Sequence, residues 1–253
     1  MLQILQAGSG SAARPLAVRA RGGSGPPVVW LGGFRSDMRA TKASALDEWA
    51  ATRGRALVRF DYGGHGESGG DFESCTISSW TEDALAVIDR FVGERPILVG
   101  SSMGGWIALL VTRALRKRAP ERAPAGLVLI APAVDFTERL MWDAFPEEIR
   151  RAILETGRFL RPTLYGSEPY PITRALIEDG RRHLMLGAPI ETGCPVHILQ
   201  GMQDPDVPWE HAMLLVEHLP ADDVALTLIK DGDHRLSRPE DLERLIRAVE
   251  GMG

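Results

Sequence analysis

The sequence predicts an α/β protein whose sheet is mostly parallel, eight-stranded and flanked by helices. Short apolar runs alternate along the chain with longer segments of helical pattern, which is the order of βαβ units. Several of these runs are continuously apolar, as expected of strands that are buried on both faces. The chain has 253 residues, 44% of them hydrophobic and 25% charged, which suits a single globular domain over residues 1–253.

Each predicted element is placed by its apolar pattern. Before Pro27, turns rich in glycine and serine at residues 8–11 and 22–25 predict two edge strands in a hairpin. The apolar runs that predict strands are Leu16–Ala20, Val28–Leu31, Ala56–Phe60, Ile97–Val99, Leu127–Ala131, Val196–Leu199 and Ala225–Ile229. The segments with an apolar stripe at helical spacing are Thr41–Thr52, Ser78–Phe91, Met103–Lys117, Trp209–Leu219 and Pro239–Glu250.

Residues 135–193 interrupt this alternation. The segment holds no convincing strand and is too long for a plain connection, so we expect an inserted helical lid. One helix is well marked in Pro146–Gly157, with proline in its first turn, acidic residues early and glycine after its last turn. Arg174–Leu186 is compatible with a second helix.

Charge and cysteine content exclude several classes of protein. The net charge is −5, from 29 basic and 34 acidic residues, and no block of like charges suggests nucleic acid as a partner. Cys75 and Cys194 stand apart, without a CxxC motif, so we expect free thiols and no metal site or other cofactor. No apolar run is long enough to cross a membrane, and the first residues lack the pattern of a secretory signal, so the expected compartment is the cytoplasm.

The pattern Gly-x-Ser-x-Gly occurs twice, at Gly66–Gly70 and at Gly100–Gly104. In a nucleophile elbow this motif joins a strand directly to a helix, and the sharp turn projects the serine hydroxyl above the sheet. Ser102 follows a buried strand and precedes an unbroken helix, whereas Ser68 lies between two loops. We therefore predict Ser102 as a catalytic nucleophile and interpret Ser68 as part of a glycine-rich turn.

A serine nucleophile needs a histidine base and a carboxylate that orients it. His65 and His234 are the histidines in predicted loops, and His234 follows the last strand, where hydrolases with this motif place their base. The other histidines fall in predicted strands or helices: His183, His197, His211 and His218. We predict His234 as the base.

The acid should follow the strand Val196–Leu199. Asp204 is the first acid beyond it, in a loop stiffened by prolines, while Asp206 lies nearer the next helix and could cap it. We prefer Asp204 and keep Asp206 as the alternative. The nucleophile, acid and base then each follow the carboxyl end of a strand, where ligands bind in parallel sheets.

An acyl-transfer site also needs backbone N–H donors for the developing oxyanion. Met103, directly after the nucleophile, is the first expected donor. For the second we predict Phe34, because the paired glycines before it let the chain turn back over the site. Phe34, Met103 and Trp106, with Trp142 and Phe145 of the lid, are apolar residues expected around the acyl side of a substrate.

These motifs resemble the α/β-hydrolase superfamily across nearly the whole chain. More narrowly, they look like the family of α/β-hydrolase domain protein ten and its bacterial relatives. The residues that carry the narrower resemblance are Gly32–Met38 with Thr41-Lys42, Phe60–Ser68, Gly100–Trp106, Val207–Trp209 and Asp233–Arg235. The resemblance implies an α/β-hydrolase fold and acyl-protein thioesterase or acyl-glucuronide esterase activity, and it places the family's triad on Ser102, Asp204 and His234.

The sequence thus predicts a serine hydrolase that cleaves carboxylic esters or thioesters through an acyl-enzyme. Its expected partner is a small acyl ester or thioester, or an acylated protein. A non-catalytic hydrolase fold that binds a ligand or a partner protein is one alternative. An amidase or a carbon–carbon bond hydrolase on the same fold is another.

Overall fold

The computed structural model describes residues 1–10, 13–162, 169–219 and 223–252. Its centre is an eight-stranded sheet in the order β1-β2-β4-β3-β5-β6-β9-β10. β1 pairs antiparallel with β2, β2 pairs antiparallel with β4, and the other neighbours are parallel. The strands are β1 Leu2–Ala7, β2 Arg14–Arg21, β3 Ser24–Leu31, β4 Arg55–Phe60, β5 Ile97–Ser101, β6 Gly126–Ile130, β9 Val196–Gly201 and β10 Val224–Ile229. The predicted fold class and the hairpin before Pro27 are confirmed.

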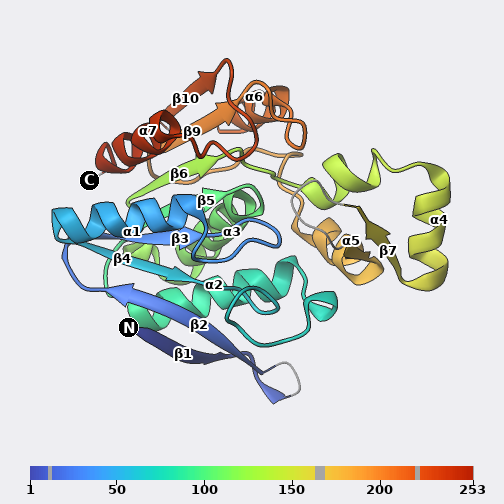
Figure 1. Ribbon diagram of the computed structural model, residues 1–253, viewed down its shortest axis with the longest axis horizontal. Coiled ribbons are helices and arrows are strands. Elements are labelled where there is room, and N and C mark those ends of the chain that lie inside the picture. The colour runs from blue at the N-terminus through green and yellow to red at the C-terminus, as the bar shows by residue number, and fades with distance from the viewer. Residues whose placement is uncertain (11–12, 163–168, 220–222, 253) are drawn as a thin grey trace.

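Helices cover both faces of the sheet (Figure 1). They are α1 Thr41–Arg53, α2 Ile77–Phe91, α3 Met103–Arg118, α6 Trp209–Glu217 and α7 Pro239–Glu250, with short 3-10 turns at Phe72–Ser74 and Pro120–Arg122. Helices α1 and α7 pack on one face, and α2, α3 and α6 pack on the other. Val28 and Trp30 of β3 belong to the core under α1 and α7, while Val29 and Leu31 belong to the core under α2, α3 and α6. This alternation explains why the strand is continuously apolar.

The insertion after β6 forms a lobe beside the sheet (Figure 1). In chain order it contains the π-helical segment η4 Thr137–Trp142, α4 Glu147–Thr156, β7 Arg158–Arg161, β8 Tyr170–Thr173, α5 Arg174–Gly180 and the 3-10 turn η5 Arg181–His183. The helix after Pro146 is present, with Gly157 as its left-handed C-cap. The expected helix from Arg174 to Leu186 is shorter, ending at Gly180.

The expectation that this segment lacks strands was wrong. β7 and β8 pair antiparallel, with Arg158 opposite Thr173 and Arg161 opposite Tyr170. The residues of β7 alternate between exposed and partly buried positions. Because the strand is only four residues long, this alternation gives little periodic signal in the sequence.

Two buried carboxylates fix the insertion: one closes its base, and the other attaches it to α2. Asp135, at its start, accepts hydrogen bonds from the backbone N–H groups of Met185 and Leu186, at 2.8–3.0 Å. Asp179 of α5 accepts hydrogen bonds from both the N–H and the hydroxyl of Ser78 in the first turn of α2, at 2.7 and 2.8 Å. The lobe is therefore fixed at its base and along α5.

Candidate active site

Ser102 occupies the sharp turn between β5 and α3. Its backbone has φ 53° and ψ −118°, a conformation that is strained for a residue with a side chain. A Cβ atom at Gly100 would lie 2.3 Å from the carbonyl oxygen of Gly104, and a Cβ at Gly104 would lie 2.0 Å from that of Leu31. The close approach of backbone to backbone therefore requires both glycines of the motif, and the strand–turn–helix context expected of a nucleophile elbow is present.

His234 and Asp204 form a hydrogen-bonded pair. Nδ1 of His234 lies 2.7 Å from Oδ2 of Asp204 and must be the donor, because an ionised carboxylate has no proton. The Asp204 side chain is fully buried, and its Oδ1 accepts the backbone N–H groups of Asp206 and Val207 at 2.8 and 2.9 Å. This arrangement leaves Nε2 of His234 as the hydrogen-bond acceptor of the ring.

Strand register brings Ser102, Asp204 and His234 to the same edge of the sheet. Ser101 is paired with Ile130 and Ile130 with Leu199, so β5, β6 and β9 end at one level. The turn before His234 packs against the end of β9, since a Cβ at Gly201 would lie within 2.6 Å of the backbone there. In the part of the chain that the structure describes, the Ser102 hydroxyl makes no hydrogen bond, and such bonds often tighten only when substrate binds.

The loop after β3 runs beside Ser102. A Cβ atom at Gly33 would lie 3.4 Å from Cβ of Ser102, so the backbone that leads into Phe34 is adjacent to the turn. Among the described residues, the backbone N–H groups of Phe34 and of Met103, the first residue of α3, have no hydrogen-bond acceptor in the protein. Neither predicted oxyanion donor is therefore committed to an acceptor in the described residues, and their role stays a prediction.

His65 supports this loop, a role that the sequence analysis missed. Its Nδ1 lies 3.1 Å from the carbonyl oxygen of Gly63, so Nδ1 carries the proton and Nε2 accepts the backbone N–H of Arg35 at 3.0 Å. Arg35 has φ 58°, so the loop is strained at this residue. Burial lowers the pKa of His65 to about 4. With both nitrogens occupied, His65 is a structural histidine and not a competing base.

The four histidines outside these loops also have bonding partners other than Ser102. They are His183 with the Ser78 hydroxyl, His197 with the Thr227 hydroxyl, His211 with the Val134 carbonyl and His218 with the Leu214 carbonyl. Ser68 is likewise structural, because its hydroxyl accepts the N–H of Ala17 and donates to the carbonyl of Asp61. The Gly-x-Ser-x-Gly motif at Gly66–Gly70 is thus a turn held by hydrogen bonds, as expected.

Aromatic rings surround Phe34. Four rings lie with centroids 5.1–5.7 Å from it, those of Phe72, Trp80, Phe136 and Tyr170. Tyr170 belongs to β8 of the insertion, so the lid contacts the loop after β3 directly. The buried ring of Trp106 packs edge-on against Phe136, with the ring centres 5.7 Å apart. Phe136, which the sequence analysis did not select, thus links Trp106 to Phe34, two residues expected to bind substrate.

The ring contacts of Trp142 and Phe145 lie within the insertion. Phe145 is 6.0 Å from Phe159 of β7, and the guanidinium of Arg181 lies 4.7 Å from the centre of the Trp142 ring. These two residues therefore shape the lid itself. Their contact with a substrate stays a prediction.

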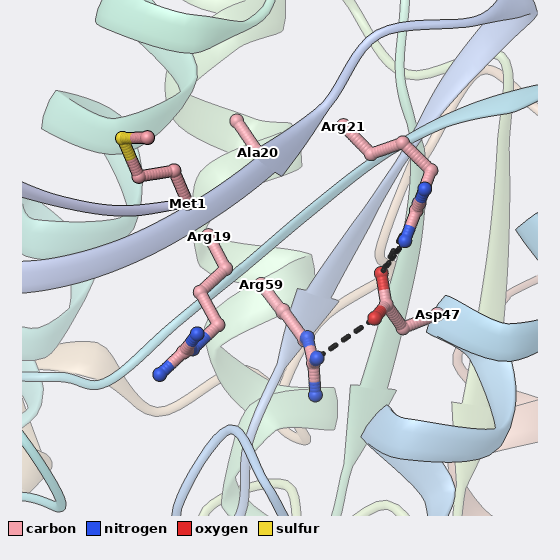
Figure 2. Close-up of a pocket in the computed structure, with 6 residues that line it drawn as sticks. All are labelled: Met1, Arg19, Ala20, Arg21, Asp47 and Arg59. Atoms are coloured by element: carbon pink, nitrogen blue, oxygen red, sulfur yellow. Dashed lines mark hydrogen bonds and ion pairs between the residues drawn. The ribbon is translucent and has the colours of Figure 1, made fainter. Parts of the chain in front are cut away.

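Two cavities lie outside the Ser102 turn. One of about 390 Å³ opens beside the loop after β3 and is lined by Arg35, Ser36, Asp37, Gly64, His65, Gly66, Asp71, Phe72, Glu73, Pro169 and Pro171. The other, of about 180 Å³, lies over β2 and β4, where Asp47 pairs with both Arg21 and Arg59 (Figure 2). Neither lining includes Ser102.

Among the described residues, one group of acidic and histidine side chains is close enough to hold a metal ion. It consists of Asp204, Asp206 and His234, whose ligand atoms lie within 4.8 Å of one another. The hydrogen bond between His234 and Asp204 already accounts for two of the three. Over the same residues, no helix combines the length and the apolarity that crossing a membrane requires.

Comparisons with known proteins identify the family and the fold. The model of the alpha/beta hydrolase family matches residues 13–245. The mitochondrial palmitoyl-protein thioesterase ABHD10 of Mus musculus is 34% identical over 238 residues, covering 94% of this chain and 78% of that protein. Among solved structures, mouse alpha/beta hydrolase domain-containing protein 10 has a TM-score of 0.87 at 32% identity, covering 100% of this chain and 98% of that one. A presumed hydrolase from Agrobacterium vitis S4 has a TM-score of 0.96 at 52% identity, with coverage of 100% and 98%. The chain belongs to the alpha/beta hydrolase family, and its sequence and fold place it with ABHD10.

Proposed function

We propose that this protein is a serine hydrolase that cleaves carboxylic esters or thioesters through an acyl-enzyme intermediate. The observation that carries the proposal is the 2.7 Å hydrogen bond between Nδ1 of His234 and the buried carboxylate of Asp204, at the same sheet edge as the strained turn of Ser102. That bond fixes the tautomer in which Nε2 can accept a proton. Ser102 is the nucleophile, His234 the base and Asp204 the residue that orients it.

In the first half of the reaction, Oγ of Ser102 attacks the acyl carbonyl carbon and its proton passes to Nε2 of His234. Asp204 stabilises the resulting imidazolium. The negative charge that develops on the carbonyl oxygen is stabilised by the backbone N–H groups of Met103 and Phe34, aided by the positive end of the α3 dipole. Two donors of this kind need no rearrangement at the moment of reaction, because backbone holds them in place.

In the second half, His234 returns its proton to the leaving thiolate or alkoxide as the bond to the acyl carbon breaks. Water, deprotonated by His234, then attacks the acyl carbon of the acyl-enzyme, and the bond to Oγ breaks as His234 passes the proton to Oγ, which releases the carboxylic acid and restores Ser102. A thiolate is a better leaving group than an alkoxide or an amide nitrogen. Thioesters and activated esters are therefore the favoured substrates, and ordinary amides are disfavoured.

The acyl group that this site accepts is apolar. The rings around Phe34, together with buried Trp106, offer hydrocarbon surface on the side of the turn that faces the insertion. Relatives named palmitoyl-protein thioesterases act on a long saturated acyl chain, which is consistent with such a surface. An acylated protein or a small acyl thioester is the proposed substrate class.

Labelling with a fluorophosphonate probe tests the proposal directly. The probe forms a covalent bond with an activated serine, so the wild-type protein should be labelled, and peptide mapping should place the label on Ser102. Ser68→Ala serves as the matched control, because that serine lies in the same sequence motif but is tied by hydrogen bonds. A label on Ser68, or labelling that survives Ser102→Ala, would overturn the assignment.

A further inference from the structure

Lys42 reaches from α1 to the turn that carries His234. Its Nζ donates a hydrogen bond to the carbonyl oxygen of Arg235, the residue after His234, although the two are 193 positions apart in the sequence. The ammonium also interacts electrostatically with the carboxylates of Asp233, Asp241 and Asp204. One cation thus connects the first turn of a helix to the loop after the last strand.

The position of Lys42 has no explanation in the helix itself. A positive charge in the first turn opposes the helix dipole, and α1 has neither an acidic residue in that turn nor a side-chain cap at Ala40. Burial, followed by the nearby charge of Arg235, lowers the pKa of Lys42 to about 8. Both effects mean that keeping the charged form here costs stability. Residues that break local rules in this way are expected at functional sites.

The turn around His234 has further contacts inside and outside itself: the carbonyl oxygen of Gly232 accepts the N–H of Gln203 at 2.8 Å, and the buried side chain of Leu236 belongs to the core under α1 and α7. Oδ1 of Asp233 accepts the backbone N–H groups of Arg235 and Leu236 at 3.1 and 2.9 Å, and Leu236 has a strained φ of 41°. The hydroxyl of Ser237 donates to the same Arg235 carbonyl at 2.9 Å. Lys42 adds a donor from a different element, α1, at the carbonyl of the residue directly after His234.

We propose that Lys42 is a positioning residue for His234, holding the 233–237 turn so that the imidazole stays aligned between Asp204 and Ser102. The inference rests on the function proposed above. Lys42 touches neither Ser102 nor a substrate in this role. Its effect passes through the Arg235 carbonyl, and small displacements of a catalytic group reduce rates steeply: about 1 Å can cost on the order of a hundredfold.

The test replaces Lys42 with methionine, which keeps the length of the side chain and removes its charge and donor. We expect kcat on a thioester substrate to fall by about tenfold or more while KM stays within about twofold, since ground-state binding does not use the base. The melting temperature should stay level, because the desolvation cost of the ammonium is removed together with its hydrogen bond. Lys117→Met, at the exposed end of α3, is the matched control and should leave kcat unchanged.

A second readout follows the His234–Asp204 hydrogen bond itself. The Nδ1 proton of His234 should give a downfield proton NMR resonance in the wild-type protein, and Lys42→Met should broaden or shift it. A kcat that falls less than about tenfold, or a loss that appears in KM instead, overturns the proposal. Should Lys42→Met fail to fold, Lys42→Ala, which removes the same donor at a helical position where alanine is well tolerated, takes its place, and an unchanged kcat in that variant overturns the proposal. Fluorophosphonate labelling that persists in Ser102→Ala identifies a failure of the proposed function and not of the role of Lys42.

Discussion

Nε2 of His65 accepts a hydrogen bond from the backbone N–H of Arg35 at 3.0 Å, so a buried neutral imidazole holds the loop that contains Phe34. A protonated His65 has no acceptor nitrogen and would break this bond. Protonation of one residue therefore opposes the folded conformation of the loop.

This relationship predicts a loss of stability in acid. The pKa of His65 is about 4 in the folded protein and 6.5 in an unfolded chain, so the unfolded chain binds more protons between these values. The stability contributed by neutral His65 is complete above about pH 6.5 and is lost as the pH falls toward about 4, by about 2 kcal/mol at pH near 5. Urea unfolding at several pH values measures it.

His65→Gln is the matched variant for that measurement. Other histidines with lowered pKa values change stability in the same direction, but they are present in both proteins. The difference between the two proteins therefore isolates His65, and the variant should lose less stability between neutral and acidic pH. If the free energy of unfolding fell equally with pH in the two proteins, the prediction would be contradicted.

Ser102→Ala should abolish turnover and leave the fold intact, because only a hydroxyl without an internal hydrogen bond is removed. Ser68→Ala should do the opposite. It removes two hydrogen bonds of a tied loop, so the free energy of unfolding should fall by about 1–2 kcal/mol while kcat stays near the wild-type value. Steady-state kinetics and urea unfolding of both variants check the pair.

Asp204→Asn should lower kcat by three to four orders of magnitude, roughly the loss seen when an orienting carboxylate is replaced in a triad. The asparagine amide has no negative charge to stabilise the imidazolium, and its NH2 group can donate to Nδ1 and so favour the wrong tautomer of His234. Asp206→Asn should cost little, because the backbone N–H of Asp206 that donates to Asp204 is kept in the variant. The reverse order of rates would move the acid to Asp206.

Longer acyl chains should be cleaved faster until the apolar surface ends. Each buried methylene contributes about 0.8 kcal/mol, so three or four added carbons should raise kcat/KM by about one to two orders of magnitude. The measurement is a series of p-nitrophenyl esters from acetyl to dodecanoyl, with matched thioesters and anilides. A flat profile removes the apolar acyl site, and anilides cleaved as fast as esters would indicate an amidase.

Local patterns were sufficient for the sheet, its helices and the turn at Ser102. Continuous apolar runs, helical periodicity and glycines at a strand–helix junction depend on neighbouring residues, so they are visible in one chain. The same reasoning preferred Asp204 and His234, which the structure places within a hydrogen bond of each other. Their catalytic roles stay predictions. The sequence did not predict the short β7–β8 pair, because four partly exposed residues show almost no hydrophobic periodicity.

The tertiary structure alone decided which distant groups meet. His65 joins the backbone of Arg35, 30 positions earlier, and Lys42 joins Arg235, 193 positions later. No periodicity encodes such pairs, because they depend on strand order and on how far each loop folds back over the sheet. The sequence by itself determined the elements and the order of the chemical groups. Packing determined their hydrogen-bond partners and pKa values, since burial and partner geometry exist only once the sheet is assembled.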